Sequence, residues 1–147
     1  MTARATAIPR LDYRPFRGTE AIAAGLVTRS QLRTAAYRRI FRDVYVNAVR
    51  PDTHELRARA VALILPAGAA VTGRSAALIW DVKSIDADHD PVEVLAPARF
   101  GPVAGLRIRT GRLDAGDIAV RKGVAVTSIL RTAWEIARSR PELDAGA

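Results

Sequence analysis

The sequence predicts an α+β fold, and three observations lead to this expectation. The chain has 147 residues, of which 49% are hydrophobic, enough to bury a core, so global disorder is excluded. Residues 15–50 carry the patterns of two short helices and a hairpin, whereas residues 51–140 mix helical stretches with short strands joined by segments rich in Pro and Gly. We therefore expect a flexible basic arm (1–14), a small N-terminal domain (15–50), an α+β domain (51–140) and a tail (141–147).

Two helices with a tight turn between them are expected at the start of the N-terminal domain. The first spans Thr19 to Ala24 and ends at Gly25, since glycine takes a positive φ without steric cost. Thr28, with Gln31 three residues later, has the form of a capping box, which predicts that a second helix begins there. We expect that helix to run to about Ala36.

A β-hairpin is expected directly after the second helix. The runs Tyr37 to Phe41 and Val44 to Val46 are rich in β-forming residues, and two polar residues separate them. No glycine stands between the runs, so the turn type stays open. The order of helix, Gly turn, basic helix and basic hairpin is typical of a minimal winged helix-turn-helix, whose second helix enters the major groove while the hairpin lies on the backbone.

The expected second helix has one apolar and one cationic face. Arg29 and Arg33 lie four residues apart on the cationic face, and Tyr37 continues the row. We interpret Arg29 and Ser30 as candidates for contact with base edges and the hairpin arginines as phosphate contacts. The candidate DNA-binding residues are Arg17, Thr28, Arg29, Ser30, Arg33, Tyr37, Arg38, Arg39 and Arg42.

The positive charge is concentrated in the first third of the chain. Residues 1–50 hold 10 Arg against three acids, a net charge of +7, whereas residues 51–147 hold 13 basic and 12 acidic groups, a net charge of +1. Clustered cations favour nucleic acid or an acidic surface as partner, because they release counterions from a phosphate backbone. The alternative is a basic face that is only solvated. A coding bias towards Arg would explain why the chain has 21 Arg and two Lys, but it would not explain why the net positive charge lies in residues 1–50.

The run AAGLVTRSQLRTAAYRRIFRDVYV resembles the N-terminal winged-helix segment of the AbiEi-type antitoxin and transcriptional regulator family. In that family a TRxQL helix leads into an Arg-rich strand and a GVY strand, and here the last motif reads Asp43, Val44, Tyr45. The runs His54 to Ala60 and Thr72 to Ala77 are also similar to that family. The chain departs from the family pattern in lacking a full helix before Thr19.

This resemblance implies a DNA-binding regulator, often of its own operon, with a cognate toxin as a further partner. Some relatives carry a C-terminal nuclease-like domain, so one alternative is the regulatory half of such a protein, here without the catalytic domain. Another alternative is a protein-interaction module that binds an acidic toxin. One such module makes few base contacts, so useful specificity would require a homodimer on double-stranded DNA or a second module.

The second domain is expected to be a small mixed sheet flanked by helices. Its expected helices are Thr53 to Leu65, Gly73 to Asp81, and a last helix capped by Thr127 or Ser128 that runs to about Arg138. Its expected strands are Ala69 to Thr72, Val92 to Leu95, Leu106 to Thr110, Ile118 to Arg121 and Val124 to Val126. Trp80 and Trp134 are both expected in the core, because helical spacing places each beside other apolar residues.

Enzyme chemistry and cofactors are not expected. The cluster Asp86, Asp88, His89 and Asp90 with Glu93 invites a nuclease or metal hypothesis, but Glu93 lacks the lysine two residues on that a restriction-type nuclease requires. We interpret this cluster as a solvated loop, Ser75 and Ser128 as helix-start residues, and His54 as a surface or capping residue. No Gly-rich phosphate loop occurs, so no nucleotide cofactor is expected.

Two features that the sequence lacks indicate the cellular compartment. Cysteine is lacking, which excludes disulfides and thiolate zinc sites and fits the cytoplasm. The N-terminus has no continuous apolar core typical of a signal peptide, and the most apolar run, residues 58–71, is interrupted by Arg59, Pro66 and Gly68. We expect a cytoplasmic protein without membrane insertion.

Overall fold

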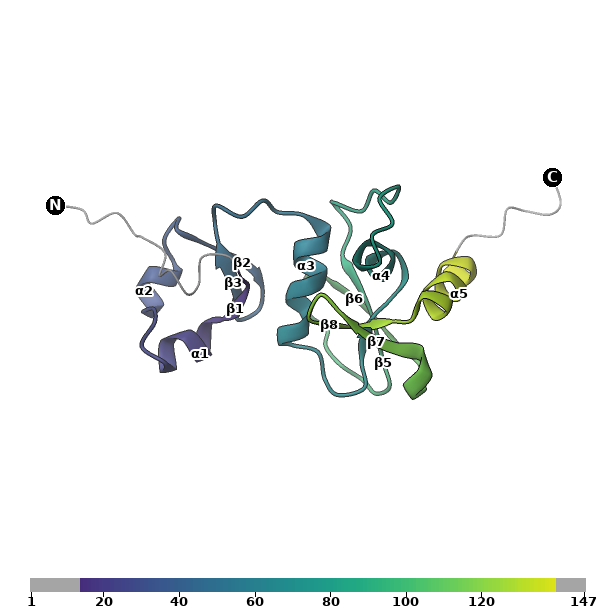
Figure 1. Ribbon diagram of the computed structural model, residues 1–147. Coiled ribbons are helices and arrows are strands. Elements are labelled where there is room, and N and C mark those ends of the chain that lie inside the picture. The colour runs from purple at the N-terminus through teal and green to yellow at the C-terminus, as the bar shows by residue number, and fades with distance from the viewer. Residues whose placement is uncertain (1–13, 140–147) are drawn as a thin grey trace. The chain divides into compact units, whose positions relative to one another are not determined.

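The computed structural model describes residues 14–139 and divides them into two units. One unit holds residues 14–52 together with 103–105, and the other holds residues 53–102 and 106–139 (Figure 1). Helices and strands are mixed, and each unit has its own sheet, an arrangement compatible with the predicted α+β class. The predicted arm, apart from Arg14, and the tail lie outside the described residues. Among the helices of residues 14–139, none is long and apolar enough to cross a membrane.

The N-terminal unit begins with two short helices separated by a tight turn. Helix α1 spans Gly18–Ala23, and Gly25 follows it with a φ of 70°, as its predicted capping role requires. Helix α2 spans Arg29–Leu32. Its N-cap, Thr28, forms the predicted capping box: the Thr28 hydroxyl accepts from the Gln31 N–H at 3.1 Å, and the Gln31 side chain accepts from the Thr28 N–H at 2.8 Å.

The prediction that α2 runs to Ala36 is wrong, because the helix ends at Leu32. Thr34 redirects the backbone there: its hydroxyl donates to the Gln31 carbonyl at 2.7 Å and accepts from the Ala36 N–H at 3.4 Å. Such local side-chain bonds compete with the helical hydrogen-bond ladder. Tyr37 therefore starts a strand and does not continue the row of side chains on α2.

A three-stranded antiparallel sheet completes this unit. Its strands are β1 (Phe16–Arg17), β2 (Tyr37–Phe41) and β3 (Val44–Asn47), in the order β1-β3-β2. The predicted hairpin is confirmed as β2 and β3. Its turn lacks glycine, and Asp43 takes the positive φ of 60° that the chain reversal needs. The two-residue strand β1 was not predicted, because a strand so short leaves no period-2 pattern.

An aromatic cluster forms the core between this sheet and the two helices. Phe16, Leu32 and Tyr37 are buried in it, with Tyr45 packed against them. The Phe16 and Tyr37 rings meet edge to face with their centroids 5.7 Å apart. The small core of this unit therefore depends on Tyr37.

The second unit contains three α-helices and a five-stranded sheet. Its elements are α3 (His54–Ala60), continued by the 3-10 turn η2 (Val61–Leu63), then β4 (Ala70–Val71), α4 (Gly73–Ile79), β5 (Val92–Ala96), β6 (Leu106–Thr110), the 3-10 turn η3 (Ala115–Asp117), β7 (Ile118–Arg121), β8 (Val124–Thr127) and α5 (Ile129–Ser139). Every strand predicted for this part of the chain is present within one or two residues of its expected ends. Ser128 caps α5 as predicted, because its hydroxyl accepts from the Arg131 N–H at 3.1 Å.

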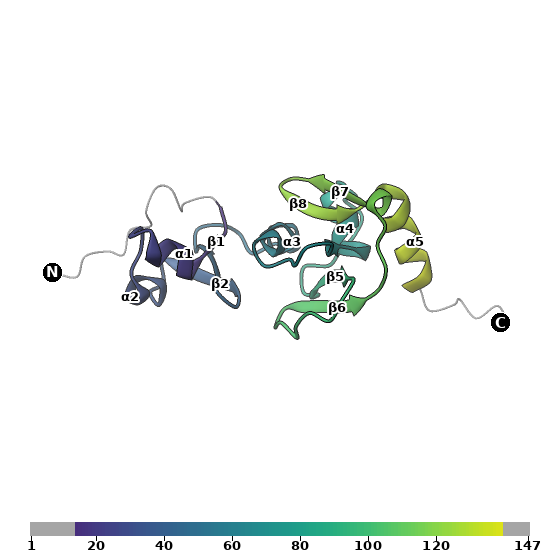
Figure 2. The same ribbon diagram turned by 90° about the horizontal axis from the view of Figure 1, so that it is seen from below.

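The sheet of this unit is mixed, with the strand order β6-β5-β4-β8-β7. β4 runs parallel to β8, and β5 runs parallel to β6, whereas β4 with β5 and β7 with β8 are antiparallel pairs. Helix α4 contacts both α3 and α5 and lies between them (Figures 1 and 2). Buried valines on β4, β5 and β8, together with Ile79 of α4, form the core. β6 and β7 are the two edges.

The prediction that Trp134 belongs to the core is wrong. Trp134 is 48% exposed and Leu130 is 83% exposed, whereas Thr132 and Glu135 of the same helix are buried. Thr132 Oγ1 donates to the Thr127 carbonyl at 3.0 Å. α5 therefore packs through its polar side, because that side finds hydrogen-bond partners in the unit.

Glu135 is the strongest of these polar attachments. Its carboxylate accepts from Arg109 of β6 at 2.6 Å and from Arg131 at 2.9 Å, while the side chain is only 1% exposed. Burial alone would raise the pKa of Glu135, but the hydrogen bonds from the two arginines outweigh burial and lower it. Glu135 is thus a buried, ionised anchor that holds α5 to the edge strand.

Candidate nucleic-acid interface

Six predicted DNA contacts are exposed on the N-terminal unit, and one of them, Thr28, also caps α2. Arg29 and Ser30 lie in the first turn of α2, Arg33 is its C-cap, Arg39 lies on β2 and Arg42 lies in the hairpin turn. Within residues 14–139, neither Arg29, Arg33 nor Arg42 forms an ion pair with a carboxylate. Their positive charges therefore face solvent without a counter-charge from the described chain. We call Arg29, Ser30, Arg33, Arg39 and Arg42 the basic surface.

Helix α2 and the hairpin turn meet at Gly18. A Cβ on Gly18 would stand 3.0 Å from Leu32 Cδ1, 3.1 Å from Asp43 Oδ1 and 2.8 Å from a Tyr45 ring carbon. Only glycine fits this close approach without displacing its neighbours. Because Arg33 follows Leu32 and Arg42 precedes Asp43, two members of the basic surface come from adjoining segments.

Asp43 connects the hairpin turn to the first turn of α1 through hydrogen bonds. Its carboxylate accepts from the Thr19 N–H at 2.9 Å and from the Thr19 hydroxyl at 2.6 Å, and its carbonyl accepts from the Gly18 N–H at 2.9 Å. Burial alone would raise the pKa of Asp43, but the Thr19 hydrogen bonds and the charge of Arg17 outweigh burial and lower it. The ionised carboxylate keeps the turn, and Arg42 with it, in a defined position.

The four predicted contacts outside the basic surface have structural roles within the unit. Tyr37 is 7% exposed and packs in the aromatic core, which corrects its placement on the DNA-facing helix. Thr28 is exposed and is the N-cap of α2, where its hydroxyl oxygen accepts from the Gln31 N–H and, within residues 14–139, its own proton stays free to donate. Arg17 forms an ion pair with Asp43 at 3.5 Å, which reduces the charge it can offer to a phosphate.

Arg38 is separated from Arg39 by the alternation of the strand. Successive residues of β2 point to opposite faces, so the two guanidinium groups do not share one surface. Arg38 is half-buried, and its Nη1 donates to the Ala48 carbonyl at 3.5 Å. We therefore retain Arg39 and Arg42 as phosphate candidates on the hairpin, and not Arg38.

In the second unit, a hydrogen-bonded cluster joins four residues that are far apart in the sequence. We call it the polar junction, and its members are His54, Ser75, Ala87 and Glu93. His54 is 1% exposed, which corrects the expectation of a surface histidine. Its Nδ1 lies 2.7 Å from the Ala87 carbonyl and its Nε2 lies 2.7 Å from Ser75 Oγ. Because a carbonyl oxygen only accepts hydrogen bonds, Nδ1 of the neutral ring carries the proton. Nε2 then accepts from the Ser75 hydroxyl. The Ser75 oxygen in turn accepts from the Glu93 N–H at 2.9 Å.

This junction is suited to holding the unit together. Burial lowers the pKa of His54, and the positive charge of Arg57 lowers it further, which favours the neutral ring. The hydrogen bonds of His54 and Ser75 connect the starts of α3 and α4 to the loop before β5 and to β5 itself. No short-range pattern predicts such a junction, because its hydrogen-bonded pairs are 18 to 33 residues apart.

Beside this junction lies a polar cavity of about 300 Å³, lined among others by His54, Arg74, Asp90, Glu93 and Arg107. Its charges are largely paired within the chain. Arg74 forms an ion pair with Asp90 at 3.0 Å, and the Glu93 carboxylate accepts from the Arg74 N–H at 2.9 Å at the start of α4. Across residues 14–139, no three His, Asp or Glu side chains come together as a metal site.

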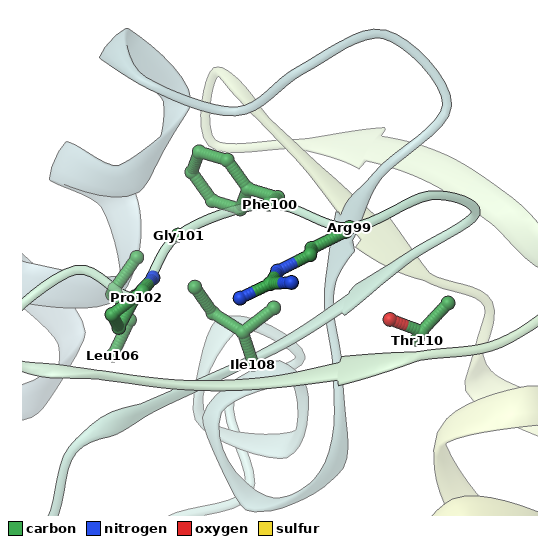
Figure 3. Close-up of a pocket in the computed structure, with 7 residues that line it drawn as sticks. All are labelled: Arg99, Phe100, Gly101, Pro102, Leu106, Ile108 and Thr110. Carbon is green, nitrogen blue, oxygen red and sulfur yellow. The ribbon is translucent and has the colours of Figure 1, made fainter.

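A second hollow lies along the edge strand β6. Arg99, Phe100, Gly101, Pro102, Leu106, Ile108 and Thr110 line it, and its volume is about 250 Å³. In the view of Figure 3 the Arg99 side chain lies between the Phe100 ring and Ile108. The lining of this hollow supplies one cation, one hydroxyl group and otherwise mainly apolar side chains. These groups do not specify the chemical class of a ligand.

Comparisons with protein-family models, with curated proteins and with solved structures find no match to this chain.

Proposed function

We propose that the chain is a DNA-binding transcriptional regulator, antitoxin-like and autoregulatory, and that it is not an enzyme. One observation carries the proposal: arginines of α2 and of the hairpin turn, two adjoining segments, are exposed without a counter-charge among the described residues. A phosphate backbone is the partner that such a cluster favours, since each phosphate neutralised releases condensed counterions. The excess of 10 Arg over three acids in residues 1–50 supports the same partner.

In this proposal the N-terminal unit acts as a minimal winged helix. α2 enters the major groove with Arg29 and Ser30 at its start, where Arg29 reaches a guanine edge, and Arg33 follows at its end. Arg39 and Arg42 lie on the phosphates beside the groove. The order of helix, turn, helix and hairpin along the chain supports this assignment.

The length of α2 limits how much sequence one chain reads. With four residues, α2 is about one turn long, so it offers only Arg29 and Ser30, with Arg33 beyond its end, to a few base pairs. Specific binding at physiological salt generally requires a larger interface. We propose that two copies of the chain bind adjacent half-sites on double-stranded DNA.

Binding of purified protein to the duplex upstream of its own gene tests this proposal. Fluorescence anisotropy at several salt concentrations should show tighter binding to that duplex than to a scrambled one, with affinity falling steeply as salt increases. The identity of the neighbouring gene indicates whether a toxin accompanies the regulator. Equal, weak binding to both duplexes, with no preference at any salt concentration, contradicts the regulator proposal.

A further inference from the structure

The outward side of α5 carries three of the large apolar side chains that the fold leaves exposed among the described residues. Ile129 is 66% exposed, Leu130 is 83% exposed and Trp134 is 48% exposed, and all three lie on one helix. Together with Ala133, Ile136 and Ala137 they follow the i, i+3, i+4 spacing of a continuous apolar stripe. We call these six residues the apolar α5 face.

A groove runs along one border of this face. Its volume is about 340 Å³, and Ile129, Ala133 and Ile136 form one wall. Trp80, the C-cap of α4, contributes to the other wall together with Val82 and Ile85 of the following loop. Contiguous exposed apolar surface beside a groove marks an interaction site in most proteins, because water would otherwise have to solvate it.

The orientation of α5 is held firmly by polar bonds, so the apolar face does not result from loose packing. Glu135 is bound by Arg109 and Arg131, and Thr132 is bound to Thr127. Turning the helix inward would break these bonds and leave a buried carboxylate unpaired. The fold therefore keeps large apolar side chains in solvent, a cost that a partner would remove.

The charges at the border of the face indicate the kind of partner. Arg138 lies over the Trp134 ring, 4.5 Å from its centroid, and forms no ion pair among the described residues. Lys83, next to the groove residue Val82, is exposed and likewise forms none within residues 14–139. Two carboxylates stand beside the groove in the sequence. Asp86 follows the groove residue Ile85, whereas Asp81, between Trp80 and Val82, is neutralised by ion pairs with Arg121 and Lys122.

A second copy of this chain does not suit these charges. The only acid on α5 is Glu135, which is buried, so two paired α5 faces would present Arg138 to a surface without a carboxylate on the helix. Residues 140–147 contain one large apolar residue, Leu143, too few to cover three exposed large side chains. We propose that the apolar α5 face with its groove docks an acidic amphipathic helix of another protein.

A synthetic helical peptide of 18 residues tests this docking directly. Leucines at i, i+3, i+4 and i+7 form its apolar stripe, glutamate fills most other positions, and fluorescein labels its N-terminus. The matched control peptide has lysine in place of every glutamate. We expect the acidic peptide to bind the full chain at least tenfold more tightly than the lysine peptide, as measured by anisotropy.

Variants locate the binding on α5. Leu130→Ser and Arg138→Glu alter exposed side chains, so the fold should be retained, and each should weaken binding of the acidic peptide at least fivefold. Val49→Ser changes a valine of the N-terminal unit that is 87% exposed and should leave binding unchanged. Arg33→Ala should also leave it unchanged, which separates docking on α5 from attraction to the basic surface.

Three results overturn the inference. The first is equal affinity for the two peptides, and the second is the absence of saturable binding by the acidic peptide. The third is concentration-dependent dimerisation in sedimentation velocity that Leu130→Ser abolishes, which would assign the face to a second copy.

Discussion

The carboxylate of Asp43 accepts two hydrogen bonds from Thr19, one from its backbone N–H at 2.9 Å and one from its hydroxyl at 2.6 Å. These residues are 24 positions apart, one in the hairpin turn and one in the first turn of α1. The pair therefore fixes the position of the hairpin relative to the two helices, on which the basic surface depends.

Replacing Asp43 should loosen the N-terminal unit. Asp43→Ala removes both hydrogen bonds and places alanine at a φ of 60°, and we expect a loss of about 1–3 kcal/mol in the free energy of unfolding. Hydrogen exchange of the β2 and β3 amides measures it within this unit. The control is Arg42→Ala, which alters an exposed neighbour and should leave hydrogen exchange unchanged. Equal protection of the β2 and β3 amides in the two variants would show that the hydrogen bonds from Thr19 do not hold the turn.

The arginines of the basic surface should differ in their effects on DNA binding. In the proposed function Arg29 contacts a base edge, so Arg29→Ala should cost about 1–3 kcal/mol on the cognate duplex and much less on random DNA. Arg39→Ala should weaken binding to all sequences alike and reduce the salt dependence by about one phosphate unit.

Competition binding against scrambled duplex measures this difference. Arg112→Ala, which alters an exposed arginine of the other unit, should change neither quantity. If Arg29→Ala and Arg39→Ala lower cognate and random binding by the same factor, the basic surface acts only through its charge.

Trp134 should contribute little to stability despite its size. Because it is 48% exposed, Trp134→Ala should cost about 1 kcal/mol or less, mainly through the lost contacts with Arg131 and Arg138. Ile79→Ala, at a fully buried position of α4, should cost about 2–5 kcal/mol. Urea denaturation followed by circular dichroism compares them, and similar losses would mean that the apolar α5 face is covered within the chain.

Stability should fall as the solution is acidified below the ordinary pKa of histidine. The pKa of His54 is lowered in the folded state, first by burial, so the unfolded chain binds a proton at a higher pH than the folded chain does. The contribution of His54 is therefore complete above about pH 6.5 and is lost as the pH falls towards its folded pKa. Urea midpoints at pH 7.5 and 5.0 measure this effect.

Two variants test the assignment of this pH dependence. His54→Gln should reduce the difference between the two midpoints, whereas His89→Gln, at the exposed second histidine, should leave it intact. A pH dependence that persists in His54→Gln would place its origin at another group.

Divalent metal ions should not confer nuclease activity on the chain. Asp90 is paired with Arg74, and the Glu93 carboxylate caps the first turn of α4, so both acids are engaged in the structure. Incubation with plasmid and Mg²⁺ or Mn²⁺ should therefore leave the DNA uncut. Cleavage that disappears in the Asp90→Ala, Glu93→Ala double variant would contradict this expectation and our interpretation of the acidic loop.

The elements that the sequence predicted correctly depend on neighbouring residues. The capping box of Thr28 and Gln31, the positive φ at Gly25 and the Ser128 cap of α5 involve partners within three residues. The strands of the second unit were predicted because short β-rich runs stand between Pro and Gly segments. Such interactions are present in the local chain before any tertiary contact forms, so they can be inferred from the sequence alone.

Tertiary structure decided which side of each element is buried. The spacing on α5 correctly indicated a helix with one apolar side, but that side faces solvent, because Glu135 finds Arg109 from a strand 26 residues away. Tyr37 shows the same limit, since its place in a strand depends on pairing with β3 and on the Phe16 ring. The buried bonds of His54 likewise join segments 21 and 33 residues apart. Periodicity within one segment carries no information about which distant groups will satisfy a charge or a hydrogen bond, and those groups settle which face is buried.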